Sequence, residues 1–230
     1  PPRSTLFPYT TLFRSMNPYD EFAVEEALRI KETAGGTIKA VTMGPERAKE
    51  VLRTALAMGV DDVLLLQTDQ VQLDGLKSAQ ALAQAMANQT YDVILLGKEA
   101  IDDGNMQVGP MLAEILNIPC VTVVTKLAVQ AGSFTAEREG EAGTEVLTGP
   151  TPCLFTCQKG LNEPRYPSIR GVMMAKKKDI PVLKPEAADS RVTITDFSYP
   201  KSRKGGQIIG EGSAAVPELV RRLREEAKVI

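Results

Sequence analysis

Residues 91–116 read YDVILLGKEAIDDGNMQVGPMLAEIL, which is a short apolar run, a polar loop rich in glycine and aspartate, and the start of an apolar helix. The run 91–97 has the length and the continuous hydrophobicity of a strand that is buried on both faces. Two similar strand–helix units precede it, with strands at 37–43 and 62–67 and helices at 46–58 and 72–88. Strands that alternate with helices in this order predict an α/β fold built on a parallel sheet.

The segments on either side extend this pattern. Asn17 and Pro18 are typical of a helix start, and apolar residues then recur at helical spacing as far as Gly35. Farther along the chain, short strand-like segments separated by turns predict an antiparallel or mixed extension of the sheet. These segments lie at 121–129, 133–139, 144–149 and 152–158.

The chain divides into three predicted regions. Residues 1–15 carry little periodicity, and we interpret them as a non-native prefix outside the fold. Residues 16–183 form the predicted α/β domain. Residues 184–230 are punctuated by proline and glycine and end in an amphipathic helix at about 214–227. Because residues 184–213 contain few apolar positions, we expect an extended C-terminal arm that packs on a partner chain.

The composition argues against several classes of function. The formal net charge is −2 and only 5% of the residues are aromatic, which disfavours a nucleic-acid-binding module. No apolar run approaches the roughly 20 residues of a membrane span. The chain has no histidine, so the commonest general base and zinc ligand are absent, and no metal site is expected. Cys120, Cys153 and Cys157 lie in apolar runs without metal-ligand spacing, which predicts buried thiols in a reducing, cytoplasmic compartment.

The loop at 97–109 follows a buried strand and is the best candidate for a phosphate site. The N–H groups of residues 107–109 open the next helix, where unsatisfied donors and the helix dipole favour an anion. Pro110 suits the first turn of that helix. Asp102 and Asp103 are better placed as acceptors for ribose hydroxyls or as backbone caps than beside a phosphate. A helix-capping loop without any ligand fits the same residues equally well, and no Gly-x-Gly-x-x-Gly or Gly-Lys-Ser/Thr motif is present.

Two longer stretches carry a specific resemblance. GKEAIDDGNMQVGP at 97–110 and KGLNEPRYPSIRGVMMAKKKDIPVL at 159–183 resemble the β subunit of electron transfer flavoprotein, and the similarity extends from Asn17 to the C-terminal helix. The resemblance implies a Rossmann-like domain of the adenine-nucleotide α-hydrolase type, and a heterodimer with an α subunit that carries the redox-active FAD. It also implies an electron carrier, not an enzyme, that shuttles electrons from flavoprotein dehydrogenases, such as the acyl-CoA dehydrogenases of fatty acid oxidation, to a respiratory or other acceptor.

The same resemblance implies a set of nucleotide-binding residues. They are Asn17, Pro18, Tyr19, Asp20, Met43, Ala100, Ile101, Asp102, Asp103, Gly104, Asn105, Met106, Gln107, Val108, Gly109, Pro110 and Met111. Many members of the family have threonine at the position of Val108. The form QVGP is similar to members whose β subunit holds a second FAD in place of AMP, so both AMP and FAD stay open for this site.

The opening of the second stretch resembles the family's partner-recognition loop, at 161–178. The resemblance assigns partner recognition to Arg165, Tyr166, Pro167, Ser168 and Ile169, and places Glu139 near the flavin-bearing domain of the α subunit. Ile169 would be the apolar anchor on a dehydrogenase, and the alternative is that it is buried in its own domain. The lysines at 176–178 either steer acidic partners or solvate the start of a strand.

Two rival functions share the expected fold. A sensor that resembles universal stress proteins would bind ATP without an α subunit. An ATP pyrophosphatase-like enzyme would need a Ser-Gly-Gly loop after its first strand, and the chain contains no such sequence.

Overall fold

The computed structural model describes residues 15–69, 74–186, 190–193, 195–196, 198–199 and 205–230. The predicted prefix, apart from residue 15, and the first two residues of the predicted helix 72–88 lie outside these. The chain forms two compact units, which divide between Val192 and Thr193.

Two sheets form in the described part of the larger unit. The first has the order β1-β2-β8 and is parallel, with Met43 opposite Leu66 and Leu65 opposite Val182. Its strands are β1 (Lys39–Gly44), β2 (Asp62–Gln67) and the short β8 (Val182–Leu183). The sequence predicted one extended sheet, whereas the described strands pair as two separate sheets.

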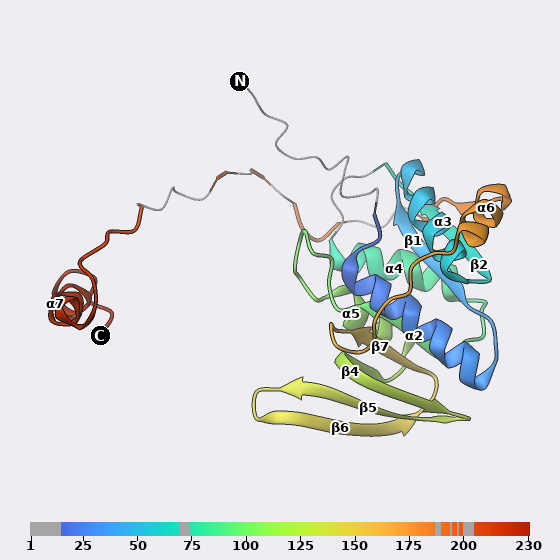
Figure 1. Ribbon diagram of the computed structural model, residues 1–230. Coiled ribbons are helices and arrows are strands. Elements are labelled where there is room, and N and C mark those ends of the chain that lie inside the picture. The colour runs from blue at the N-terminus through green and yellow to red at the C-terminus, as the bar shows by residue number, and fades with distance from the viewer. Residues whose placement is uncertain (1–14, 70–73, 187–189, 194, 197, 200–204) are drawn as a thin grey trace. The chain divides into compact units, whose positions relative to one another are not determined.

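The second sheet has the order β3-β7-β4-β5-β6. Its strands are β3 (Val93–Gly97), β4 (Cys120–Gln130), β5 (Ser133–Gly140), β6 (Gly143–Pro150) and β7 (Cys153–Cys157). The pairs β3–β7 and β7–β4 are parallel, whereas β4–β5 and β5–β6 are antiparallel and extend the sheet as a long hairpin (Figure 1). The predicted antiparallel extension is therefore confirmed.

Helices cover both faces of β7 (Figure 1). These are α2 (Pro18–Ala34), α4 (Gly75–Met86) and α5 (Val108–Leu116). Side chains alternate along the strand, so Leu154 and Thr156 face α5, whereas Cys157 lies near Asp20 and Glu26 of α2. The loop at 98–107, part of the candidate phosphate loop, therefore joins strand β3 to helix α5, and both of these elements are packed in the core.

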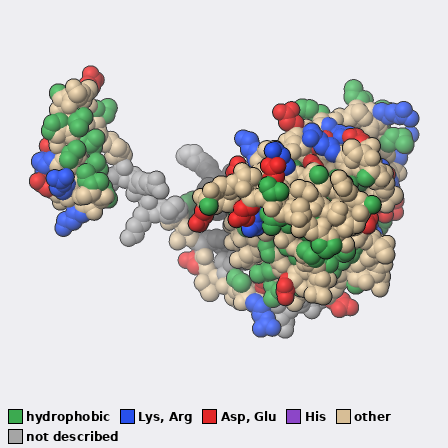
Figure 2. Space-filling model, turned by 90° about the horizontal axis from the view of Figure 1, so that it is seen from below, with side chains coloured by type: hydrophobic (Ala, Val, Ile, Leu, Met, Phe, Trp, Pro, Cys, Tyr) green, Lys and Arg blue, Asp and Glu red, His purple; other side chains and the backbone are tan. Residues whose placement is uncertain are grey.

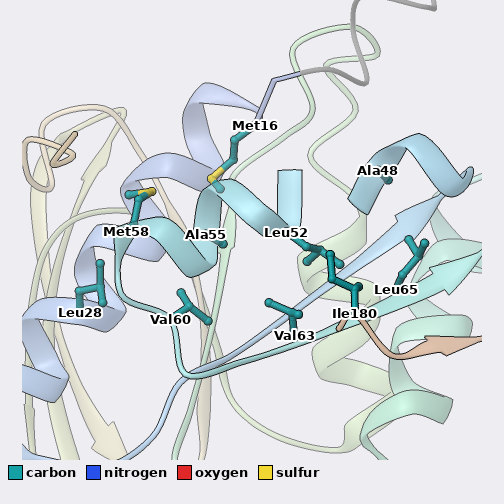
Figure 3. Close-up of a cluster of buried hydrophobic side chains, with 10 residues drawn as sticks. All are labelled: Met16, Leu28, Ala48, Leu52, Ala55, Met58, Val60, Val63, Leu65 and Ile180. Atoms are coloured by element: carbon teal, nitrogen blue, oxygen red, sulfur yellow. The ribbon is translucent and has the colours of Figure 1, made fainter. Parts of the chain in front are cut away.

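Three apolar clusters hold the larger unit together. One lies between α2, α3 (Lys49–Met58) and β2, and includes Leu28, Leu52 and Val63 (Figure 3). A second joins α4 and α5 to β3 and β7. In the third, the rings of Phe134 and Phe155 meet edge to face at 4.9 Å. As predicted, Cys153 and Cys157 are buried thiols; Cys120 is half-buried.

Helix α6 (Ile169–Lys177) was not predicted from the sequence. The sequence analysis treated this stretch as a loop leading into a strand. Ser168 caps the helix, because its hydroxyl accepts a hydrogen bond of 3.0 Å from the N–H of Gly171. Several of its apolar side chains stay exposed, so the usual sign of a helix, an apolar face packed on the core, is weak here.

The smaller unit contains η2 (Ser213–Ala215) and α7 (Val216–Glu225), close to the predicted helix. Hydrophobic side chains gather on its surface (Figure 2), among them Ile208, Val216 and Leu219. None of the helices in the described ranges is long and apolar enough to cross a membrane.

Candidate functional site

The N-terminus of α2 meets the carboxyl end of β3, and this junction is the centre of the candidate nucleotide site. The N–H of Gly97 donates a hydrogen bond of 2.7 Å to Oδ1 of Asp20. Asn17 Nδ2 donates to Glu99 O at 2.8 Å and to Asp20 Oδ2 at 3.1 Å. These bonds tie residues 17–20 to the strand end, although the two segments are far apart in sequence.

Gly97 is required for this close approach. A Cβ atom at Gly97 would lie 2.7 Å from Tyr19 Cβ and 2.8 Å from both the N and the Oδ1 atoms of Asp20. The ammonium of Lys98 lies 4.8 Å from the centroid of the Tyr19 ring and 3.2 Å from the carboxylate of Glu99. The lysine is therefore held at the mouth of the loop by two contacts.

Two polar groups at this junction are in unusual surroundings. Burial raises the pKa of Asp20 and outweighs the hydrogen bonds from Gly97 and Asn17, which act in the opposite direction. Oδ1 of Asn17 is buried and has no hydrogen-bond partner among the described residues. A buried acceptor without a partner is destabilising, so it offers a place for a donor such as an amino or hydroxyl group of a ligand.

The N-terminus of α5 forms the other side of the loop. Its first intrahelical bond runs from Met111 N to Gln107 O, so the preceding N–H groups have no acceptor within the helix. Gly109 packs so closely on β7 that a Cβ there would lie 2.5 Å from Thr156 Cγ2. A Cβ on Gly75, at the start of α4, would lie 3.1 Å from Gln107 Cβ. The amides proposed to hold phosphate are thus placed by helix packing on two sides.

The loop between these ends is exposed, and its acidic residues cap the backbone. Asp102 Oδ1 accepts from the N–H of Asp103 at 3.1 Å, and Asp103 Oδ1 accepts from the N–H of Asn105 at 3.2 Å. Met106 has a φ of 54°, which turns the chain into α5. Of the two roles considered for the aspartates, capping is observed.

The other sequence-predicted residues occupy the same region, except for one. Ala100, Ile101 and Gly104 lie in the exposed loop, and Pro110 and Met111 lie in the first turn of α5. Met43 lies in the first sheet, near the carboxyl end of β1. Ligands collect at this end of parallel strands, so its placement agrees with that rule, but the contacts described above do not involve it.

No group of three or more metal-binding side chains occurs among the residues that the structure describes. The unpartnered Asn17 oxygen and the α5 amides instead suit a nucleotide, with polar base or ribose groups on one side and phosphate on the other.

The predicted recognition segment presents an apolar surface. Tyr166 is 95% exposed and Ile169 is 84% exposed, so the alternative in which Ile169 is buried in its own domain is excluded for this chain. Met173 and Met174 on α6 are also exposed. Arg165 behaves differently, because its guanidinium is bound to Glu25 and Glu32 of α2.

Helix α6 is fixed on α3. Gly171 lies against the carbonyl of Ala57, where a Cβ would collide with the oxygen. Arg53 Nη1 donates to the carbonyls of Ala175 at 2.9 Å and Lys176 at 3.2 Å, which satisfies acceptors at the helix end. Lys178 donates to the carbonyl of Asp61. The lysine run therefore forms the end of α6, and the short strand β8 follows it after a few residues.

Glu139 lies near the end of β5, paired with Thr144 of β6, and its side chain is exposed. Sequence reasoning missed Glu25, Glu26 and Asn162, which connect α2 to the recognition segment. The two adjacent glutamates on the α2 face that also carries Leu28 were the available signal, since acidic residues there need partners.

A family model described as the electron transfer flavoprotein domain matches residues 12–188. The chain belongs to the electron transfer flavoprotein family. It is 46% identical to the electron transfer flavoprotein subunit beta of Bacillus subtilis, over 94% of this chain and 88% of the relative. It is 39% identical to the subunit beta of Syntrophomonas wolfei, over 93% and 85% of the two chains. The mitochondrial subunit beta of Oryza sativa subsp. japonica is 38% identical, over 94% and 87%.

Proposed function

We propose that this chain is the β subunit of a heterodimeric electron transfer flavoprotein and works as an electron carrier between flavoprotein dehydrogenases and a further acceptor. The family match over residues 12–188 is the observation that carries the proposal. The exposed apolar segment at Tyr166 and Ile169, held on a rigid support, is the feature that a docking function requires. The sensor alternative is not favoured, because the curated relatives reported above are named subunit beta.

The cofactors divide between two places in this proposal. An α subunit supplies the FAD that exchanges electrons with the partner, and flavin is the group that carries the redox chemistry. The site at the ends of β1 and β3 holds AMP or a second FAD. Asn17 offers its free oxygen, the α5 amides offer donors to phosphate, and residues 100–106 border the site. The chain's own role is to bind, orient and shield these groups rather than to catalyse a reaction.

The assembly is tested by co-expression with an α subunit of the family. We expect a 1:1 heterodimer in which the backbone amides of the C-terminal unit are protected from hydrogen exchange. Extraction of the bound nucleotides then decides the β site: two FAD per heterodimer indicate a second FAD, and one FAD with one AMP indicates AMP. A stable monomer that does not bind the α subunit but binds ATP would favour the alternative function as a nucleotide-binding sensor. Location in the cytoplasm stays a prediction, to be checked by fractionation.

The docking role is tested by Ile169→Ala. Loss of a well-desolvated apolar anchor typically weakens binding by about 2 kcal/mol or more, so the concentration of acyl-CoA dehydrogenase required should rise roughly tenfold or more. The melting temperature should hardly change, since the side chain is 84% exposed. Val146→Ala is the matched control, because Val146 is also β-branched and is 64% exposed, but lies on β6, outside the recognition segment. An unchanged requirement for the dehydrogenase in Ile169→Ala would refute the docking role.

A further inference from the structure

The side chain of Arg165 makes four hydrogen bonds within the chain, although it lies only four residues before Ile169. Its Nε and Nη2 atoms donate to the two carboxylate oxygens of Glu25 at 2.8 and 3.0 Å. Nη1 and Nη2 donate to the two oxygens of Glu32 at 2.5 and 3.2 Å. The backbone N–H of Arg165 also donates to Glu25, at 3.1 Å. Both carboxylates are therefore bound in the two-pronged manner that fixes orientation as well as distance.

Glu25 is a firm support for this arginine. It is 3% exposed and lies in the middle of α2, where Arg29 donates a further hydrogen bond of 3.1 Å to it. Burial alone would raise the pKa of Glu25, but the hydrogen bonds from Arg165 and Arg29 outweigh burial and lower it. The carboxylate stays ionised near neutral pH and keeps its partners.

A second tie lies three residues earlier. Asn162 Nδ2 donates to the carbonyl of Phe22 at 3.0 Å and to Glu26 Oε2 at 2.9 Å. The segment from Asn162 to Arg165 is therefore fastened to α2 at both of its ends. Pro164 restricts the backbone between Asn162 and Arg165, and Pro167 restricts it between Arg165 and the start of α6. Helix α6 itself is fixed on α3 by the Gly171 contact.

We propose that Arg165 is a positioning residue: through its bonds to Glu25 and Glu32 it holds the exposed segment so that Ile169 is presented to a redox partner in one conformation. This rests on the proposed docking function of Ile169. The alternative is that the charge of Arg165 attracts an acidic partner directly. Two carboxylates already surround that charge, so little of it is available for attraction over a distance, whereas an ordered segment loses less entropy when it binds.

The test is a double-mutant cycle in the assembled heterodimer, with an acyl-CoA dehydrogenase as the electron donor. The first variant, called the Met–Gln variant below, combines Arg165→Met with Glu25→Gln, so that no buried carboxylate is left without its arginine. The second is Ile169→Ala, and the third combines all three changes. We expect the first variant to raise the KM for the dehydrogenase about tenfold with kcat unchanged. We also expect the third to be little worse than the second, because both act through the same contact.

Two further variants separate positioning from charge. Arg165→Lys keeps the charge but loses the two-pronged geometry, so it should resemble the Met–Gln variant and not the wild type. Arg170→Met removes a positive charge from an exposed neighbour in α6 and should change the KM much less. Hydrogen exchange of the amides of residues 163, 165, 166 and 168 should become faster in the Met–Gln variant while nucleotide content stays the same.

The outcomes are distinguishable. If Ile169→Ala raises the KM but the Met–Gln variant does not, or if the two effects multiply fully in the triple variant, the positioning role is wrong while the docking function stands. If Arg165→Lys behaves as wild type and Arg170→Met matches the Met–Gln variant, charge and not position is responsible. If Ile169→Ala itself has no effect, the docking function fails.

Discussion

Substitution of Gly109 by alanine tests how α5 is placed on the sheet. The new Cβ would lie 2.5 Å from Thr156 Cγ2, whereas the next neighbour, Leu154 Cδ2, is at a normal 3.6 Å. Thr156 is 2% exposed and its hydroxyl accepts a hydrogen bond of 2.9 Å from Val123 N, so the methyl group cannot rotate away without breaking that bond. Overpacking of this kind costs about 1–3 kcal/mol, partly offset by up to about 1 kcal/mol of helix propensity.

The melting temperature of Gly109→Ala should therefore fall by several degrees, since about 1 kcal/mol corresponds to roughly 2–4 °C in a domain of this size. Nucleotide retention should fall with it, because α5 carries the amides of the proposed phosphate site. Thr156→Ser is the matched suppressor, as it removes the methyl group and keeps the hydroxyl for Val123. In the serine background Gly109→Ala should be neutral or stabilising by up to about 1 kcal/mol.

The decisive result is that Gly109→Ala lowers the melting temperature in the wild-type background but does not lower it in the Thr156→Ser background. Thermal melting of the wild type, the two single variants and the double variant measures this. An equal fall in melting temperature from Gly109→Ala in both backgrounds would show that the contact with Thr156 does not determine the effect. Loss of nucleotide in the suppressed double variant, with normal stability restored, would instead locate the defect in the ligand site and not in packing.

Other predictions follow from titratable side chains. Burial raises the pKa of Glu26, so the protein should lose stability as the pH rises through that value, and Glu26→Gln should remove this part of the pH dependence in thermal melts. Hydrogen bonds from Ser190 and the backbone lower the pKa of Asp74 to about 2. The contribution of Asp74 to folding stability should therefore persist above pH 4 and be lost as the pH falls towards 2. A carboxyl NMR titration with a midpoint near 4 would contradict this. Burial raises the pKa of Cys153 to about 11, and burial also raises the pKa of Cys157. Both thiols should therefore resist a thiol reagent at pH 8 until the protein is unfolded, and fast labelling of the native protein would disprove their burial.

Much of the parallel part of the fold was predictable because β2 and β3 are nearly continuous apolar runs. β2 and β3 were placed within two residues, and the hairpin β5–β6 within one, since turns at Gly132 and Gly143 separate short strand-like segments. The candidate loop at 97–109 was predictable for the same reason: it follows such a run and opens a helix with an early proline. What the pattern could not show is the contact of Gly97 with α2, because it joins segments 77 residues apart.

Helix α6 and the partners of Arg165 were not predictable from periodicity. The apolar residues of α6 are largely exposed, and Pro164, Pro167 and Gly171 are typical of loops. Only the packing of Gly171 on α3 shows why glycine is required within a helix there. Arg165 was assigned to partner recognition, yet its guanidinium points to α2, at Glu25, which lies 140 residues earlier.

Stability alone does not explain why Glu25 is kept buried beside Arg165. Replacement of a buried ion pair by apolar residues of similar volume is often neutral or stabilising, whereas an ion pair adds directional constraints that apolar contacts lack. Directional constraints matter here because α2 holds two separate parts of the chain in position. Its first turn braces the strand end at Gly97 through Asp20, and its middle holds the segment that ends at Ile169 through Glu25. A helix of 17 residues is rigid over that distance, so the candidate nucleotide site and the proposed docking segment share one support, and a change that shifts α2 should disturb both together.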